Sequence, residues 1–300
     1  MPGDIPAFKS PVGEARYFAA YDAALGLWPV PCESIDVTTD YGQTHINACG
    51  SKDALPLVLL HGGYAGSTMW FPNIADLARR FHVLALDTIG EPGKSVPTRK
   101  NASKRDMAAW LVGVLDELGI SQTHVIGLSR GGWLALNLAI HAPQRLRKIV
   151  LLSPAASFIA LNRFFSAIVG SVIHIPTRSV AKIALYSWVT KGFMVNEVYA
   201  EQFILGLQNW NWTMGTNGYS GVMPSVFPDE ELHQIKNPIL MLIGDHDRLN
   251  PPTVIDRAKQ MIPQIEAEIV PCAGHLLSME QPERVDACVL EFLTGRRVEI

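Results

Sequence analysis

One serine has the surroundings that a nucleophile requires. Residues 127–131 read GLSRG, the pattern G-x-S-x-G, with Ser129 at the centre. A strand-like run at 123–127 precedes it, and an apolar helical pattern begins at 132. In a tight turn from strand to helix the serine hydroxyl is exposed, and the flanking glycines avoid collisions with backbone. The pattern predicts Ser129 as the nucleophile of an acyl transfer; the alternative is a serine that only caps a helix.

A serine hydroxyl needs a neighbouring base that is held in one tautomer. Nine histidines are available, and His275 stands out because residues 272–275 (CAGH) form a loop between the last predicted strand and the C-terminal helix. That loop lies at the sheet edge where ligands bind in open α/β sheets. We therefore predict His275 as the base. Four others fit helix ends, the surface or strands: His82, His124, His141 and His233.

The third member follows the strand 238–244, where residues 244–248 read GDHDR. A strand-end loop that returns over the sheet favours the later aspartate, so we predict Asp247 as the acid, and Asp245 remains the alternative. The chain order Ser, Asp, His is the one expected for this architecture. A metal site at 245–247 would lack further ligands at a sensible spacing, and we expect no metal.

The sequence HGG at 61–63 directly follows the apolar run 56–60. Glycines there let backbone N–H groups turn towards the space above Ser129, as an oxyanion hole requires. We expect Gly63 to supply one N–H, with Tyr64 as the alternative, and Arg130 to supply the other. A glycine-rich turn without a ligand role is the competing interpretation. We expect His61 to brace the loop.

The elements that would position these residues alternate along the chain. Residues 32–50 fit two strands around a turn. Apolar runs typical of buried strands occupy 56–60, 81–87, 123–127, 148–153, 238–244 and 266–271. Helical patterns occupy 74–80, 103–118, 132–141, 252–261 and 282–293. This alternation predicts an α/β fold with a mainly parallel sheet covered by helices on both faces.

Residues 155–230 contain no clear strand and many aromatic residues. We interpret them as a helical insertion, a cap over the sheet edge, between the two parts of a core domain, 1–154 and 231–300. A second small packed core is the alternative, and the two are compatible. The aromatic residues of the insertion are Phe158, Phe164, Phe165, Trp188, Phe193, Tyr199, Phe203, Trp210, Trp212, Tyr219 and Phe227. As pocket-lining candidates we name Tyr64, Phe158, Trp188, Phe203, Trp210 and Leu276.

The composition excludes several classes of protein. The 300 residues are 48% hydrophobic and 18% charged, which fits a large core. The formal charge of -3 offers no broad attraction to nucleic acid or anionic membranes. The four cysteines form no CxxC pair, which indicates free thiols in a reducing compartment. Residues 1–15 lack a signal-peptide pattern and the apolar run 164–175 is too short to cross a bilayer, so we expect a cytoplasmic protein, monomeric or homodimeric.

The chain resembles the α/β-hydrolase superfamily from position 56 to the C-terminus. The motifs that carry this resemblance are HGG, residues 87–95 (DTIGEPGKS), GLSRG, GDHD and AGH. More narrowly, residues 25–45, 67–78 and 274–285 are similar to bacterial carboxylesterases of the naproxen-esterase type. The resemblance implies an eight-stranded sheet with a helical cap, no cofactor, and hydrolysis of small carboxylic esters by the triad named above. It places the acid at position 247.

Two departures from that group matter. Arg130 replaces a smaller or apolar residue, which puts a cation near the pocket mouth; we expect it to pair with an acidic surface residue rather than with an anionic substrate. The cap diverges most. The same triad supports a carbon–carbon hydrolase, a lactonase or an acyltransferase, and a non-catalytic ligand receptor is the alternative from another class. Haloalkane dehalogenase and epoxide hydrolase are disfavoured, since both use an aspartate where this chain has Ser129.

Overall fold

The computed structural model of the chain describes residues 6–99, 103–161, 167, 175–211 and 222–296. Those residues form a nine-stranded sheet with the order β1-β2-β4-β3-β6-β7-β8-β9, and β5 pairs with β2. The predicted eight-stranded sheet is therefore confirmed, with the two-residue β5 in addition. The strands are β1 (Cys32–Thr39), β2 (Gly42–Cys49), β3 (Pro56–Leu60), β4 (His82–Leu86), β5 (Val96–Pro97), β6 (Thr123–Leu128), β7 (Leu146–Leu152), β8 (Ile239–Gly244) and β9 (Glu266–Val270).

The sheet is mostly parallel. β1 and β2 form an antiparallel hairpin, and β2 also runs antiparallel to β4. From β4 onward the neighbouring strands are parallel, in the order β4, β3, β6, β7, β8 and β9. Every residue of β6 and β8 is buried, because a parallel strand covered on both faces exposes neither row of its side chains. The carboxyl ends of these strands meet at one edge, where the predicted site residues follow them.

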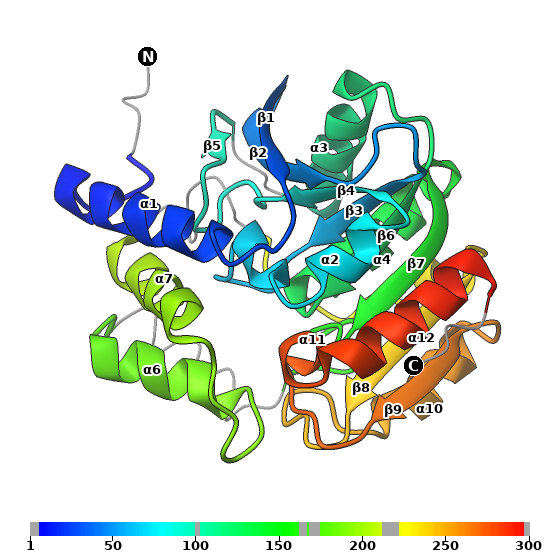
Figure 1. The fold of residues 1–300 in the computed structure, drawn as a ribbon. Coiled ribbons are helices and arrows are strands. Elements are labelled where there is room, and N and C mark those ends of the chain that lie inside the picture. Colours follow the sequence, from blue (N-terminus) through cyan, green and yellow to red (C-terminus); the bar gives the residue numbers. More distant parts are fainter. Residues whose placement is uncertain (1–5, 100–102, 162–166, 168–174, 212–221, 297–300) are drawn as a thin grey trace.

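Helices cover both faces of the sheet (Figure 1). Side chains of α3 (Lys104–Glu117), α4 (Arg130–His141) and α10 (Val254–Met261) belong to one apolar cluster. Those of α2 (Ile74–Ala78), α11 (Leu277–Glu280) and α12 (Pro282–Thr294) belong to the other. Two short 3₁₀ helices, η1 (Ser67–Trp70) and η2 (Pro143–Arg145), lie in the connections.

The helix ends follow local rules. The Ser103 hydroxyl accepts the N–H of Asp106 and caps the start of α3. Pro282 opens α12 at a position where no N–H is needed, and Gly295 ends it in the left-handed conformation with φ 69°. These signals explain why the predicted bounds of both helices lie within a residue or two of the observed ones.

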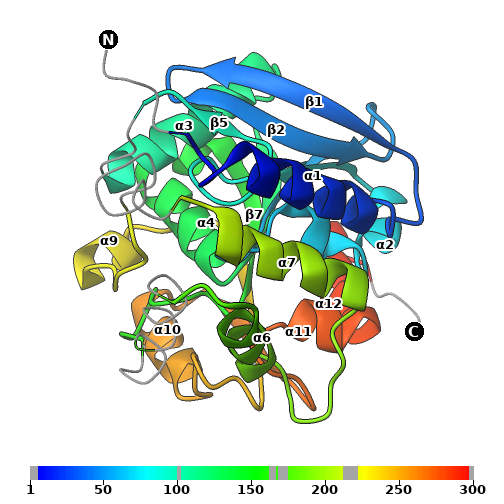
Figure 2. The ribbon, with the colours of Figure 1, turned by 90° about the vertical axis from the view of Figure 1, so that its left-hand side faces the viewer.

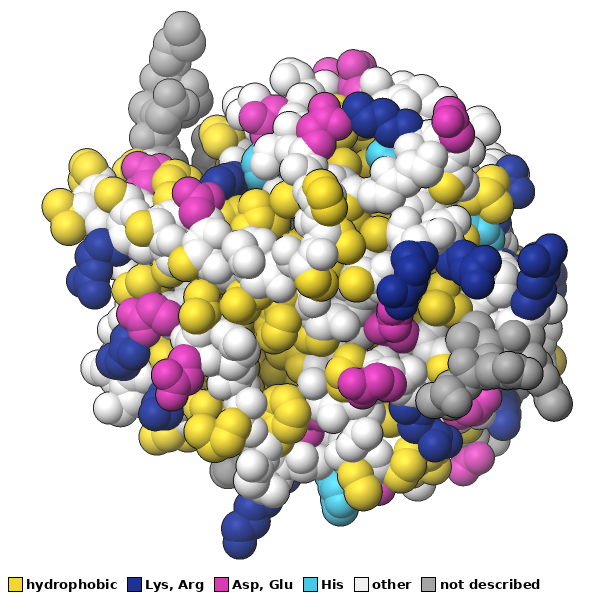
Figure 3. All heavy atoms as spheres, in the orientation of Figure 1, with side chains coloured by type: hydrophobic (Ala, Val, Ile, Leu, Met, Phe, Trp, Pro, Cys, Tyr) yellow, Lys and Arg dark blue, Asp and Glu magenta, His cyan; other side chains and the backbone are white. Residues whose placement is uncertain are grey.

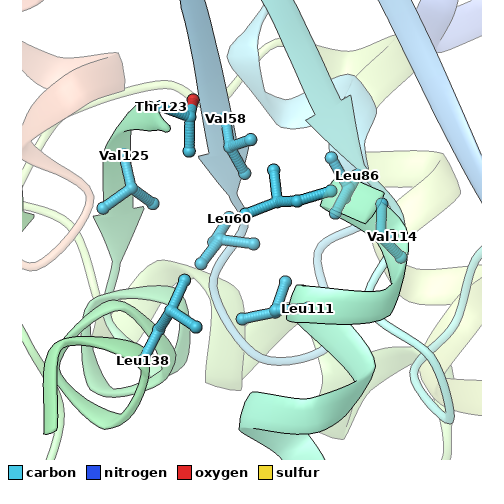
Figure 4. A pocket seen from close by; sticks show the side chains of 9 residues that line it. Val58, Leu60, Leu86, Leu111, Val114, Thr123, Val125 and Leu138 are labelled. Carbon is cyan, nitrogen blue, oxygen red and sulfur yellow. The ribbon is translucent and has the colours of Figure 1, made fainter. Parts of the chain in front are cut away.

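A small apolar void remains in the first cluster, between the sheet and helices α3 and α4 (Figure 4). Its lining is aliphatic apart from one threonine, so water would find almost no hydrogen-bond partner there. The void is an imperfection of core packing, and none of the predicted site residues lines it. It is lined by Val58, Leu60, Leu86, Leu111, Val114, Leu115, Thr123, Val125 and Leu138.

The chain between β7 and β8 departs from the alternating pattern. Its described residues form α6 (Arg178–Ser187), α7 (Glu197–Asn209) and α9 (Asp229–His233), with loops between them. Apart from an isolated bridge between Trp210 and Phe8, the described part of this region pairs with no strand. Four of the aromatic residues named above lie outside the described residues: Phe164, Phe165, Trp212 and Tyr219.

An N-terminal helix, α1 (Pro11–Leu25), lies along α7 (Figure 2). The sequence analysis assigned no element there. Two buried hydrogen bonds join the two helices to η1. The Thr68 hydroxyl donates to Gln202 Oε1 at 2.6 Å, and Gln202 Nε2 donates to the Tyr17 hydroxyl at 3.4 Å. Because polar groups are costly to bury unpaired, these hydrogen bonds fix α7 against α1 and η1.

Hydrophobic side chains gather on the face formed by α1, α6 and α7 (Figure 3). Val12 of α1, Ile183 of α6 and Met194, between α6 and α7, are 70%, 65% and 71% exposed. In the described part of the chain, no helix combines the length and the apolar character that crossing a bilayer requires.

Candidate active site

Ser129 occupies the turn between β6 and α4. Its backbone has φ 53° and ψ -113°, a conformation that is costly for any residue with a side chain. Three hydrogen bonds hold it: the Ser129 N–H donates to the Leu152 carbonyl at 2.8 Å, and its carbonyl accepts the N–H groups of Trp133 and Ala155, both at 3.1 Å. The strained turn of the G-x-S-x-G pattern is therefore present.

The glycines of this turn are required by space. A Cβ on Gly127 would overlap the Gly131 carbonyl, and a Cβ on Gly131 would overlap the Leu60 carbonyl. Backbone cannot move aside as a flexible side chain can. The spacing of the motif thus follows from the close approach of β3, β6 and α4, as the sequence analysis expected.

The HGG loop passes directly beside the serine. A Cβ on Gly62 would lie 3.6 Å from the Cβ of Ser129, and one on Gly63 would lie 3.8 Å from Cδ of Arg130. The His61 ring holds the loop in place, because Nδ1 donates to the Gly62 carbonyl at 2.7 Å and Nε2 accepts the Thr88 N–H at 2.9 Å. Both ring nitrogens are engaged, so the predicted bracing role of His61 is confirmed.

The two candidate N–H donors of this loop differ in their surroundings. Tyr64 has a positive φ of 70°, and its N–H donates to Oε2 of Glu91 at 2.8 Å. Within the described residues, no hydrogen bond engages the N–H of Gly63. The N–H of Tyr64 is thus already used by Glu91, whereas that of Gly63 is not engaged within the described residues.

Arg130 pairs with Glu91, whose second oxygen holds Tyr64. Arg130 Nε lies 3.1 Å from Glu91 Oε1, and both side chains are 6% exposed. The guanidinium also donates from Nη1 to the Val222 carbonyl at 2.8 Å. The expected pairing with an acidic residue is confirmed, but the partner is buried and not on the surface. The positive charge of Arg130 is balanced within the protein.

His275 and Asp247 form a buried pair. His275 Nδ1 lies 3.0 Å from Asp247 Oδ2 and 3.2 Å from Oδ1, and the two residues are 3% and 5% exposed. Asp247 Oδ1 also accepts the N–H groups of Leu249 at 2.8 Å and Asn250 at 3.1 Å. Burial acts to raise the pKa of Asp247, but the neighbouring His275 and these hydrogen bonds outweigh it, and the pKa lies below its usual value. The carboxylate is therefore charged at neutral pH.

Asp245, the alternative acid, has another function in the loop. It is exposed, and its Oδ1 accepts the N–H of Ala273 at 3.1 Å. Slight burial acts to raise its pKa, and hydrogen bonds from the backbone of Cys272 and Ala273 lower it to a net value below the usual one. Asp245 thus braces the loop that carries His275, and Asp247 is the aspartate that contacts the imidazole.

The far side of the His275 ring is available for chemistry. Its Nε2 is buried and has no hydrogen-bond partner among the described residues. With Asp247 accepting from Nδ1–H, Nε2 carries a lone pair and can take up a proton. No group of three or more His, Cys, Asp or Glu in the described part of the chain is arranged to hold a metal ion.

The pocket candidates fall into separate clusters. Trp188 lies against His275, with ring centroids 6.5 Å apart at 62°, and against Phe203 at 5.5 Å and 85°. Both rings belong with Leu276 and Tyr64 to one apolar cluster. Phe158 packs in the cluster on the other face of the sheet. The assignment of Trp210 to the pocket finds no support, because its ring packs 5.1 Å from Phe8 in the cluster around α1.

Two carboxylates at the site had no role in the sequence analysis. Glu91 lies in the glycine-rich turn after β4, at the same sheet edge as Ser129, and that position could have identified it. Glu280, at the end of α11, accepts one hydrogen bond from the N–H of Gly274, just before His275, and another from the N–H of Thr190. No local pattern marks it, since Thr190 is distant in sequence.

Comparison with known proteins identifies relatives of this chain. Residues 57–287 match the model of the Alpha/beta hydrolase family. The chain is 39% identical over 283 residues to the uncharacterized carboxylesterase nap of Bacillus subtilis (strain 168), covering 93% of each protein. It is 37% identical over 282 residues to carboxylesterase YbfK of the same strain, covering 93% of this chain and 94% of the relative. The crystal structure of naproxen esterase from Bacillus subtilis superposes with a TM-score of 0.88 at 37% identity, covering 95% of this chain and 99% of the other.

Proposed function

Because the chain belongs to the α/β-hydrolase family, we propose that it is a carboxylesterase that hydrolyses small carboxylic esters through Ser129, His275 and Asp247. The observation that carries the proposal is the buried contact of 3.0 Å between His275 Nδ1 and Asp247 Oδ2. It lies at the sheet edge that also carries the strained serine turn. The relatives named above as carboxylesterases support the same reaction.

The reaction proceeds in two acyl transfers. Asp247 holds Nδ1–H of His275, so Nε2 accepts the Ser129 proton as the oxygen attacks the ester carbonyl. The same nitrogen then donates this proton to the leaving alcohol, and an acyl-enzyme remains. Water enters, loses a proton to Nε2 and attacks the acyl carbonyl, which releases the acid and restores Ser129. Asp247 stabilises the imidazolium that forms in each half.

Two backbone N–H groups receive the oxyanion in this scheme. We assign them to Gly63 and Arg130, from the loop beside Ser129 and from the start of α4. The Glu91 carboxylate supports both, because it pairs with the Arg130 side chain and accepts the N–H of Tyr64, the residue after Gly63. Loss of one such donor typically costs about 10²–10³-fold in turnover.

The substrate pocket that we propose is lined by Tyr64, Trp188, Phe203 and Leu276. Trp188 is central to it, since its ring lies against His275 and its buried indole N–H has no partner among the described residues. That N–H can donate to an oxygen of a bound ester. We treat residues 155–230 as a cap on the core domain of residues 1–154 and 231–300, with α6 and α7 as its described helices.

The setting in which the enzyme acts follows from two further observations. All four cysteine thiols are free, as expected for a protein of a reducing compartment, and we propose the cytoplasm. The exposed apolar side chains of α1 and α6 favour a homodimer over a monomer. Light scattering of the purified protein distinguishes these two states.

The decisive experiment compares two serine variants on p-nitrophenyl acetate. We expect Ser129→Ala to lose at least about 10⁴-fold in kcat. Ser157→Ala removes another buried hydroxyl close to the turn and should keep the parent rate, since that hydroxyl donates only to the Ala155 carbonyl. A Ser129→Ala protein that hydrolysed the ester at the parent rate would disprove the assignment.

Two further measurements separate the competing functions. A fluorophosphonate probe should label the parent protein and not Ser129→Ala, whereas a non-catalytic receptor would remain unlabelled. Product analysis with a panel of p-nitrophenyl esters, a lactone and a ring-cleavage product identifies the bond that is hydrolysed. The panel of increasing acyl length also measures the depth of the pocket beside Trp188.

A further inference from the structure

The loop that carries His275 is attached to the cap through backbone hydrogen bonds. The His275 N–H donates to the Trp188 carbonyl at 2.7 Å. Trp188 follows α6 directly, and its ring is the one that lies against the imidazole. The backbone and the side chain of Trp188 thus both lie against His275.

Glu280 adds a second attachment between the same two segments. Its Oε1 accepts the N–H of Gly274 at 2.9 Å, and its Oε2 accepts the N–H of Thr190 at 2.7 Å. Gly274 directly precedes His275, and Thr190 lies two residues beyond Trp188. Each oxygen of one carboxylate therefore holds one of the two segments.

The packing around this carboxylate leaves little freedom. Glu280 is 8% exposed. A Cβ on Gly274 would lie 2.8 Å from the Trp188 carbonyl oxygen and 3.0 Å from Glu280 Oε1, so only glycine fits between the two attachments. A buried carboxylate with both oxygens used by backbone donors is a strong and directional restraint.

We propose that Glu280 is a positioning residue, which fixes the His275 loop to residues 188–190 so that the base and the pocket wall stay aligned. This inference rests on the proposed function, because it assumes that His275 is the base. Glu280 contacts no reacting atom in this scheme. It acts through the backbone of Gly274 and Thr190, and a small displacement of either would move the imidazole or the Trp188 ring relative to the ester.

The carboxylate is specifically required, because both of its partners are donors. In Glu280→Gln one oxygen remains an acceptor, but the amide NH₂ faces the other N–H, and one attachment is lost. In Glu280→Asp both oxygens remain, but the side chain is one methylene shorter and reaches one partner at a time. Both variants keep the residue polar and close to the original volume.

The test measures kcat and KM for p-nitrophenyl esters in Glu280→Gln, Glu280→Asp and a matched control. Asp286→Asn is that control, since Asp286 is a buried acid on the adjacent helix α12 whose Oδ1 bonds to Asn73 and not to the His275 loop. We expect both Glu280 variants to lose about 10- to 100-fold in kcat with KM within about twofold of the parent, as for a misaligned catalytic group. Labelling by a fluorophosphonate should slow by a similar factor, and Asp286→Asn should change neither quantity.

The outcomes are distinguishable. Parent-like kcat and labelling in a folded Glu280→Gln would overturn the positioning role, as would a rise in KM alone or an equal loss in Asp286→Asn. If Glu280→Gln does not fold, Glu280→Asp decides by the same criteria. Ser129→Ala, measured in parallel, reports on the proposed function itself: if that variant stays active, the triad is wrong whatever Glu280 does.

Discussion

Replacement of Asp247 by asparagine tests how this site fixes the protonation of its histidine. In the structure Oδ1 accepts two backbone N–H groups, from Leu249 and Asn250, and Oδ2 faces Nδ1 of His275. The amide oxygen of the variant must stay with the two backbone donors. The NH₂ group then points at Nδ1, where a second donor cannot be tolerated.

The ring would respond by moving its proton to Nε2. That tautomer has no lone pair towards the serine, so the base is lost although the geometry is preserved. An effect of this kind is expected to lower kcat by about 10⁴-fold, which corresponds to about 5 kcal/mol of transition-state stabilisation. KM should change little, because Asp247 is buried, at 5% exposed, and acts through His275.

The assay is steady-state hydrolysis of a p-nitrophenyl ester, with Asp245→Asn as the matched control. Asp245 is in the same loop, but it bonds to the Ala273 N–H and not to the imidazole. We expect the control to keep kcat within about threefold, since the change weakens only hydrogen bonds from the loop backbone to an exposed side chain. If Asp245→Asn lost more activity than Asp247→Asn, or if Asp247→Asn kept a tenth of the parent rate, the tautomer argument would be refuted.

Three further predictions concern the scaffold. Gly131→Ala should give little folded protein, because its Cβ would overlap a backbone carbonyl, whereas Gly113→Ala in α3 should be neutral or stabilising. Soluble yield and thermal unfolding measure both variants, and equal yields and equal melting temperatures would contradict the steric argument. Glu91→Gln should lower the unfolding free energy by about 3 kcal/mol and reduce kcat, because it leaves the buried Arg130 charge unbalanced; unchanged denaturant midpoints would count against this. Burial raises the pKa of Asp286 to about 8. Between about pH 4 and 8 the unfolded chain therefore binds fewer protons than the folded protein, and stability falls as pH rises. Asp286→Asn should abolish this pH dependence in denaturant titrations at about pH 5 and 8, and a pH dependence that persists would exclude Asp286 as its source.

The sequence sufficed for features whose physical cause is local. The central strands β3 and β8 are continuous apolar runs, and the serine turn needs glycine at 127 and 131 because backbone approaches both. Asp247 and Asp245 differ by two positions in one loop, so spacing only favoured the later one. The contact with His275 depends on how β8 and β9 place their following loops, which is a property of the assembled sheet.

Other features depend on contacts between distant segments. Trp210 is aromatic, as a pocket residue often is, but its ring packs against Phe8, which lies just before α1, and the sequence analysis assigned no element to that stretch. The hydrophobic periodicity of α1 is weak, since it is buried by α7 as well as by the core. Glu280 shows no signal because its two partners come from the cap and from the His275 loop.

The hydrogen bonds that link Tyr17, Gln202 and Thr68 join the cap to the N-terminal helix and to η1, so the cap is not an independent unit. Phe203 of the cap helix α7 contacts Trp188, the tryptophan beside the catalytic base. The N-terminal helix α1 packs against the same helix. Anyone transplanting a cap from a relative to alter ester selectivity should therefore transplant the first helix with it. A graft that replaced residues 155–230 alone would remove Gln202 and leave the hydroxyls of Tyr17 and Thr68 without this partner.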